Sequence, residues 1–301
     1  MIDATVERPV AVGAAADAPE VVAGKWRETW KRLLHRPASV VGMVIVAAFV
    51  LLALGADLLA PYDPLVGDLS RRLQGPTGAH WLGTDALGRD TLSRIIHGAR
   101  TSFQIQVAVI GIALGLGTAW GVVAGYFRGW VDDVSMRVAD VLLAFPGILL
   151  AITIVAVLGA GFVNIIIAIG IASLPGLARL MRGLVLGLRE LEYVEAARAI
   201  GESNVSIMWR YILPGTIGPL TVAASLRMAS VMLSASGLSF LGLGILPPTP
   251  EWGAMLADSR DYMFSSPHQM FIPGLVITFV VVGFNLLGDG LRDALDPKMR
   301  G

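Results

Sequence analysis

The sequence predicts an all-α membrane protein with six transmembrane helices. Hydrophobic residues make up 55% of the 301 residues and charged residues 15%, and the mean hydropathy is +0.70. A soluble domain carries roughly 25% charged residues. Six apolar runs approach or exceed the length of about 20 residues that a helix needs to cross a hydrocarbon core of about 30 Å. These runs are residues 39–60, 103–125, 139–158, 162–180, 217–243 and 271–290.

The first apolar run follows a basic stretch and is too long for a cleavable signal. Five basic residues lie between Lys25 and Arg36, and a signal peptide has only roughly 7 to 15 apolar residues. We therefore expect a retained transmembrane anchor at 39–60. The preceding tail, residues 1–38, is rich in alanine, valine and small polar residues without a helical pattern, so we expect it to be largely disordered.

The segment 61–100 is the largest polar segment between two apolar runs. From Leu87 to Arg100, apolar and basic residues alternate at helical spacing, which predicts an interfacial helix leading into the second span. Charges of alternating sign at spacings of about four favour pairs within this helix. These charges are Asp85, Arg89, Asp90 and Arg94.

The later spans contain residues that are unusual for a membrane. Pro175 and Gly176 predict a kink or an early break near the end of the fourth span. Arg227 lies about ten residues into the fifth span, where a lone cation costs about 2.5 to 3.5 kcal/mol. It either faces a translocation path or is a structural arginine that snorkels or pairs with backbone. Small residues at helical spacing in the same span favour close helix packing; they are Ser234, Ser236, Gly237 and Ser239.

The distribution of lysine and arginine predicts the orientation. With the N-terminus inside, 16 basic residues lie on the inner side and six on the outer side, of which five are in 61–102. The positive-inside rule therefore puts residues 1–38 and 291–301 in the cytoplasm, together with the polar segment 178–215.

A polar insert at 186–213 separates the fourth and fifth apolar runs. Apolar residues recur there at three-residue spacing beside a charged face, which predicts an amphipathic helix. Gly201 stands where a left-handed turn is needed, and Ser203 or Asn204 can cap a second helix that ends at Leu213, before Pro214. Such an insert either lies in a groove of a soluble partner, presenting Ala196 and Ala197, or rests on lipid.

Several chemistries are not expected. The 23 basic and 23 acidic residues balance, so no overall field favours nucleic acid. The chain has no cysteine, and the one Gly-Lys pair, Gly24-Lys25, is followed by Trp26 and forms no phosphate-binding loop. We expect no metal, no cofactor and no catalytic residue in this chain. The four histidines lack metal-ligand spacing; they are His35, His80, His97 and His268.

Part of the polar insert resembles a known motif. Six residues between 195 and 214 match the EAA loop of ABC importer permeases; they are Glu195, Ala196, Ala197, Gly201, Leu213 and Pro214. The resemblance implies that this loop is a cytoplasmic coupling helix that seats on the ATP-hydrolysing subunit. Tyr211 stands where an aliphatic residue is usual, which should alter packing rather than docking.

Three further stretches resemble the dipeptide and oligopeptide permeases, and among them the second, C-type subunit. Ala235 stands where that family usually has a glutamate, and Arg227 is not expected from it. The stretches are WLGTDALGRDTLSRIIHGARTS (81–102), LSFLGLG (238–244) and GDGLRDALDP (288–297).

The resemblance implies a MetI-like type I permease fold, with the ABC transporter transmembrane domain at 101–290. It also implies an inner-membrane complex with a homologous permease as heterodimer partner, two ATP-binding subunits and an extracytoplasmic peptide-binding protein. The chain would then translocate dipeptides or oligopeptides by ATP hydrolysis in the partner subunits, without being an enzyme itself. The alternatives are nickel chelates or glutathione as substrate, or a secondary transporter with no ATPase.

Two residue sets gain a possible role from this resemblance. The binding protein would contact either the charged group Asp85, Arg89, Asp90 and Arg94 or the outer loop 245–270. The prolines and Glu251 of that loop equally suit a rigid cap. Arg227 would meet substrate carboxylates in the path. We also predict that Gly201→Asp leaves membrane insertion intact but uncouples the ATPase, because a side chain there clashes and adds charge.

Overall fold

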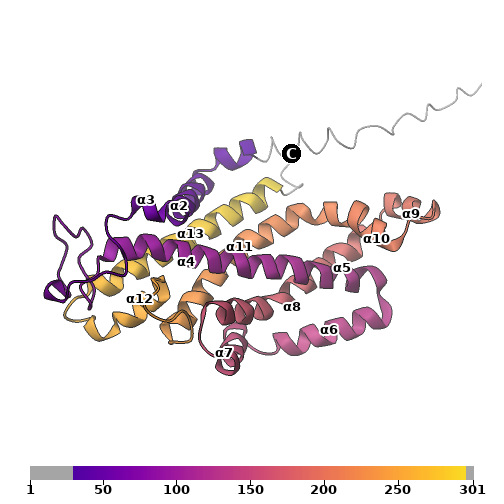
Figure 1. Cartoon of the computed structure of the whole chain (residues 1–301). Helices are drawn as coiled ribbons and strands as arrows, with labels where there is room; N and C mark the ends of the chain where they lie inside the picture. Colours follow the sequence, from indigo (N-terminus) through magenta and orange to yellow (C-terminus); the bar gives the residue numbers. More distant parts are fainter. Residues whose placement is uncertain (1–29, 296–301) are drawn as a thin grey trace, which may run out of the picture.

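The computed structural model describes residues 30–295, which contain no β-strand and fold into long helices running between two ends of the molecule (Figure 1). Residues 30–35 are helical, so this part of the N-terminal tail is not disordered; residues 1–29 and 296–301 lie outside the described range. The α-helices are α2 (Pro37–Leu54), α3 (Ala56–Leu59), α4 (Thr91–Ile112), α5 (Thr118–Phe127), α6 (Gly129–Leu143), α7 (Gly147–Leu158), α8 (Phe162–Leu188), α9 (Glu192–Ala199), α10 (Asn204–Ser206), α11 (Leu213–Phe240), α12 (Trp252–Asp258) and α13 (His268–Leu295).

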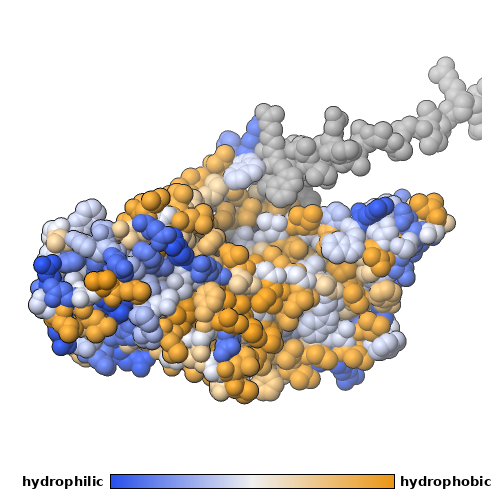
Figure 2. Space-filling model, in the orientation of Figure 1, coloured by the Kyte–Doolittle hydropathy of each residue, from blue (hydrophilic) through white to orange (hydrophobic). Residues whose placement is uncertain are grey.

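Two rods of 37 residues each run through π-helical turns. The turn η2 (Ala113–Gly117) joins α4 to α5, and η3 (Ile207–Ile212) joins α10 to α11. Together with α2, α8 and α13, these rods make five helices long and apolar enough to span a membrane, and a sixth span exists if the bent pair α6–α7 is counted as one. The predicted class, an all-α membrane protein with six spans, is confirmed. Figure 2 shows the corresponding apolar belt between two hydrophilic ends.

The third and fourth spans differ from the prediction in opposite ways. The run 139–158 is not one straight helix, because α6 and α7 meet at a bend of 86°. Pro146 explains this break: it has no N–H to donate and disfavours helical geometry at Phe145. The early break expected at Pro175 is absent, since α8 continues to Leu188. Pro175 is buried between neighbouring helices, which tolerate a proline inside a membrane helix.

The prediction of an interfacial helix before the second span was also wrong. Residues from Thr91 onward form the first turns of α4, whose start is capped by Asp90 accepting from the Ser93 N–H, and most of these turns are buried. The alternating pattern arises because apolar residues pack on α2, α11 and α12, while Arg94 and Arg100 pair with Asp85 and Asp57 respectively.

Glycines let the helices approach closely. Gly117, Gly121 and Gly125 form one stripe that packs on α8; a Cβ at Gly121 would lie 2.3 Å from the Ala178 carbonyl oxygen. The start of α2 packs in the same way on the end of α13, where Arg36 and Asp293 form an ion pair. These contacts put the two ends of the described chain on one side of the molecule (Figure 1).

Candidate functional site

The polar insert forms α9 and a tight turn at one end of the molecule (Figure 1). The last turn of α9 ends as expected at Gly201, whose φ is +83°. The Glu202 N–H donates to the Ala197 carbonyl at 3.1 Å and the Gly201 N–H to the Arg198 carbonyl at 3.0 Å, which together make a Schellman motif. Ser203 then caps the next helix by accepting from the Ser206 N–H at 3.2 Å.

The second helix of the insert does not end at Leu213. It continues through η3 into α11 and passes Pro214, which occupies the first turn of α11. A proline cannot donate to the carbonyl four residues earlier, and the wider hydrogen-bond pattern of a π-helix accommodates this gap. The insert is therefore rigidly continuous with a transmembrane helix at one of its two ends.

One face of α9 is buried against this second helix. Val194 and Ala197 are buried in a cluster with Ile207 and Ile212, and Leu213 packs beside them. The expectation that Ala197 is presented to a partner is thus wrong, because Ala197 forms part of the insert's own core. Glu195 and Ala196 are exposed, as are Gly201 and Pro214.

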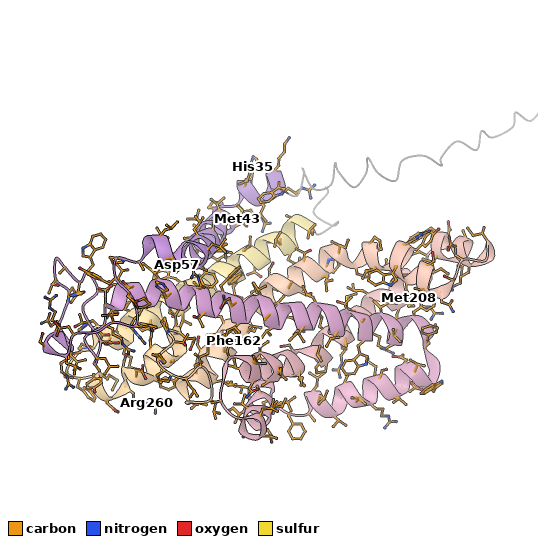
Figure 3. The ribbon with its side chains drawn as sticks, viewed as in Figure 1. His35, Met43, Asp57, Phe162, Met208 and Arg260 are labelled. Atoms are coloured by element: carbon orange, nitrogen blue, oxygen red, sulfur yellow. The ribbon has the colours of Figure 1, made fainter. Side chains whose placement is uncertain are left out.

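The exposed face of the insert is apolar at its tip. Ile200, Trp209 and Val205 are 76%, 67% and 61% exposed. Sequence reasoning missed these three because spacing alone does not separate them from buried residues. Ile200 lies three residues after the buried Ala197, and Trp209 lies three residues before the buried Ile212. In Figure 3, Met208 marks this part of the chain, far from Asp57 and Arg260 near the other end. Large apolar side chains at a protruding, otherwise polar end are typical of a surface that binds another protein.

The insert is fastened to the end of α5 by Tyr126. The Tyr126 hydroxyl donates to Asn204 Oδ1 at 2.8 Å, its carbonyl accepts from Arg189 Nη1 at 2.6 Å, and the Arg198 guanidinium lies 5.6 Å from its ring centroid. Tyr211, the position that departs from the EAA pattern, accepts at its carbonyl from the Tyr193 hydroxyl at 3.3 Å. A force on α9 therefore reaches α5, α8 and α11 together.

The structure changes the reason for the predicted effect of Gly201→Asp. A Cβ at Gly201 would meet no atom within 4 Å, so no clash occurs inside the chain. The cost comes from the left-handed backbone, which a non-glycine residue adopts with strain of about 1 kcal/mol. We expect normal insertion and a partial loss of ATPase association, to be measured by co-purification. Gly78→Asp, in the exposed segment before α4 with equally open space at its Cβ, is the control for added charge. Full association of the Gly201 variant would contradict the prediction.

Arg227 borders a cavity of about 490 Å³ between α8 and α11. Its guanidinium donates to the Ser173 carbonyl at 3.4 Å, and a Cβ on Gly176 would lie only 2.8 Å from its Nη2. Ser234 lines the same cavity, whereas Ser236 and Ser239 are buried. The serines of α11 thus divide between helix packing and the cavity.

At the other end, the alternating charges are paired, but not within one helix. Asp85 lies in the turn before α4, and its Oδ2 accepts from Arg89 Nε at 2.7 Å and lies 3.3 Å from Arg94 Nε. Asp90 caps α4 and contacts His80 Nδ1 at 2.9 Å. Arg89, Asp90 and Arg94 are buried, so they brace the loop and are not free for a partner.

The loop 245–270 is held by Glu251 and Trp252. Glu251 caps α12 by accepting from the N–H groups of Gly253 and Ala254, both at 2.9 Å, and the Trp252 indole donates to the Ile95 carbonyl at 2.9 Å. Both side chains are buried. The Glu251 side chain therefore fastens the start of α12, as expected of a rigid cap, and is not exposed on the surface. Among residues 30–295, no group of three or more potential ligands lies close enough to hold a metal ion.

Burial raises the pKa of Glu251 above the ordinary value of 4.5, against the opposing effect of its two backbone donors. A group with a raised folded-state pKa stabilises most below its unfolded pKa and loses that contribution as pH rises through the folded pKa. We expect the unfolding temperature of Glu251→Gln, relative to wild type, to increase from pH 5 to pH 8 in detergent. Asp68→Asn is the control: hydrogen bonds from Ser70 lower the pKa of Asp68, so its difference from wild type should stay constant over this range. A constant difference for Glu251→Gln would contradict the prediction.

Comparison with known proteins assigns the family. The model for a "binding-protein-dependent transport system inner membrane component" matches residues 117–301, and that for the "N-terminal TM domain of oligopeptide transport permease C" matches residues 24–76. The glutathione transport system permease protein GsiD of Pectobacterium atrosepticum is 46% identical over 276 residues, covering 91% of this chain and 92% of that protein.

Two further relatives agree. The dipeptide transport system permease protein DppC of Alkalihalophilus pseudofirmus is 46% identical over 275 residues, covering 91% of this chain and 90% of that protein. GsiD of Escherichia coli O1:K1 is 47% identical over 284 residues, covering 94% of each chain. The chain therefore belongs to the family of inner membrane components of binding-protein-dependent transport systems, as a multi-pass permease of the C type.

Proposed function

We propose that this chain is one of two membrane subunits of an ATP-driven importer for short peptides. The observation that carries the proposal is near full-length similarity to permeases named for dipeptide and glutathione transport. Dipeptides and glutathione are both short peptides, so the substrate class follows from what the relatives share. Glutathione stays within this class as a second candidate substrate, favoured by the relatives that carry its name.

The insert around α9 is the proposed docking site for an ATP-hydrolysing subunit. Its apolar tip, Ile200, Val205 and Trp209, would enter a pocket of that subunit, with Glu195 and Ala196 beside it. Gly201 makes the turn, Ala197 and Leu213 form the floor, and Pro214 starts the transmembrane rod. This assignment puts α9 and both ends of the chain in the cytoplasm, in agreement with the excess of basic residues there.

Closure of the ATPase pair would move α9 as a rigid body. Because Tyr126 ties the insert to α5 and η3 continues into α11, the movement would tilt several spans at once. Such tilting would alternate the path between an inward-open and an outward-open state.

The complex needs further subunits for this cycle. We propose a homologous permease as the second half of the path, two ATP-binding subunits, and an extracytoplasmic binding protein that delivers peptide to the end carrying α12. The exposed apolar side of α6 and α7 supports a membrane-embedded partner or lipid there, since Trp130, Val141 and Val157 are all more than half exposed.

The test is uptake into liposomes that hold this chain with its paired permease and ATPases. We expect uptake of labelled dipeptides or glutathione that needs both ATP and the binding protein added outside. Uptake driven by an ion gradient without ATP would instead identify a secondary transporter. ATP-dependent uptake restricted to another ligand, such as a nickel chelate, would keep the importer and refute the peptide assignment.

A further inference from the structure

The middle of α11 carries a polar stripe that is unusual for a membrane-spanning helix. Arg227, Ser230 and Ser234 follow one another at spacings of three and four residues, which puts them on one face. Arg227 is midway between Leu213 and Phe240, about 20 Å from either end of the helix at 1.5 Å per residue. A polar face in the middle of a membrane-spanning helix is costly where it meets lipid.

This stripe lines a cavity with room for a ligand. The cavity measures about 490 Å³, within the roughly 300 to 1,000 Å³ of small-molecule sites. Small residues make the space, namely Ser173 and Gly176 on α8 and Ala223 on α11. Gly176 in particular leaves room for the guanidinium, since a Cβ there would lie 2.8 Å from Arg227 Nη2.

The cation in this cavity lacks a counter-charge from the part of the chain that the structure describes. Within residues 30–295, Arg227 makes one hydrogen bond, the 3.4 Å contact with the Ser173 carbonyl, although a guanidinium has five N–H donors. By contrast, Arg179 and Arg182 on α8 are paired with Asp140 and Asp132 of α6 respectively. Arg227 thus offers unused donors to a carboxylate, which a guanidinium binds in bidentate fashion.

A second cavity continues the first toward the α9 end. It measures about 420 Å³, shares Leu180, Ala223 and Leu226 with the first, and reaches Arg292 near the end of α13. A carboxylate released from Arg227 would therefore move along a groove of this chain toward another cation at the cytoplasmic end.

We infer that Arg227, with Ser230 and Ser234, forms a transient binding site for the carboxylate of a peptide substrate in a water-accessible path. The inference rests on the proposed function for the identity of the ligand, because dipeptides and glutathione both carry free carboxylates at neutral pH. It assigns the stripe to water and substrate, and not to lipid or to an acidic residue of the paired permease.

The absence of cysteine from the chain allows a direct test of water access. Ser230→Cys and Ser234→Cys, in the reconstituted complex, should react with membrane-impermeant methanethiosulfonate reagents. Val44→Cys on α2, which is 62% exposed and lines neither cavity, is the control for an exposed position outside the path and should not react. The wild-type complex corrects for cysteines of the other subunits. Unreactive cysteines at both serine positions would overturn the inference, whatever the complex transports.

The role of the charge is tested by replacing and restoring it. Arg227→Cys should lower uptake of dialanine or S-methylglutathione about tenfold or more, as expected for losing a hydrogen-bonded charge. A positively charged thiol reagent should recover most of this loss, and a negatively charged reagent of similar size should not. Equal effects of the two reagents, or unchanged uptake by Arg227→Cys, would overturn the assignment of Arg227 as a carboxylate-binding site.

A second variant covers the case in which Arg227→Cys does not assemble. Gly176→Ala, which displaces only the flexible end of Arg227, should still slow uptake. A normal rate would then contradict the inference. No uptake by wild type would refute the proposed function, while the labelling result would still decide water access.

Discussion

Ile200→Asp is expected to release the ATP-hydrolysing subunits from this chain while leaving its membrane insertion and folding unchanged. Ile200 is 76% exposed and lies next to the Gly201 turn, so the carboxylate is solvated in the free chain. In the proposed complex it would be buried without a partner, which costs about 3 kcal/mol or more, a roughly 100-fold loss of affinity. Co-purification of the ATPases with tagged chain measures the effect.

The matched control for this change is Phe264→Asp. Phe264 is 93% exposed but lies at the opposite end of the molecule, between α12 and α13. It introduces the same charge at an exposed apolar position, and ATPase recovery should equal wild type. Equal recovery of the ATPases by both variants would show that the α9 tip is not the docking surface.

Trp252→Ala is expected to cost the largest amount of folding stability. The indole is fully buried among Phe49, Met255 and Ile95, and its N–H donates to the Ile95 carbonyl at 2.9 Å. Removing a buried tryptophan leaves a cavity and costs about 3 to 5 kcal/mol. Thermal unfolding of the purified chain in detergent should show a clear fall in the transition temperature.

Trp81→Ala controls for the loss of an indole as such. Trp81, in the segment before α4, is 71% exposed, so its removal should change the transition temperature little. A shift for Trp252→Ala no larger than that for Trp81→Ala would mean that α12 does not anchor its end of the bundle.

Local signals in the sequence predicted the parts of the site that depend on local chemistry. Gly201 and Ser203 adopt the turn and cap expected of them, because a left-handed glycine and a capping serine act over a few residues. The number and rough positions of the spans followed from length and hydropathy alone.

The prolines show where sequence reasoning stops. Pro146 breaks a span, Pro175 lies inside an unbroken helix, and Pro214 follows a π-helical turn. One residue type gives three outcomes because neighbouring helices decide whether the missing hydrogen bond is tolerated. Asp85 could not be matched to Arg94 from spacing either, since the partners meet through a turn outside the helix.

The exposure of individual residues on α9 was also beyond the sequence. Ala196 and Ala197 are adjacent and chemically identical, yet one is exposed and the other is buried against Ile207 and Ile212. Only the fold of the insert on itself separates them, and it moves the candidate docking surface to Ile200 and Trp209.

The most direct test of the coupling role is crosslinking from Ala196→Cys in the complete complex. Because the chain has no cysteine, this variant presents one thiol on the exposed face of α9. A short thiol-to-amine crosslinker should join it to an ATP-hydrolysing subunit, with a yield that changes on adding ATP, and Val44→Cys should give no such product. Crosslinks to lipid or to the paired permease alone, with none to an ATPase, would contradict the coupling role assigned to α9.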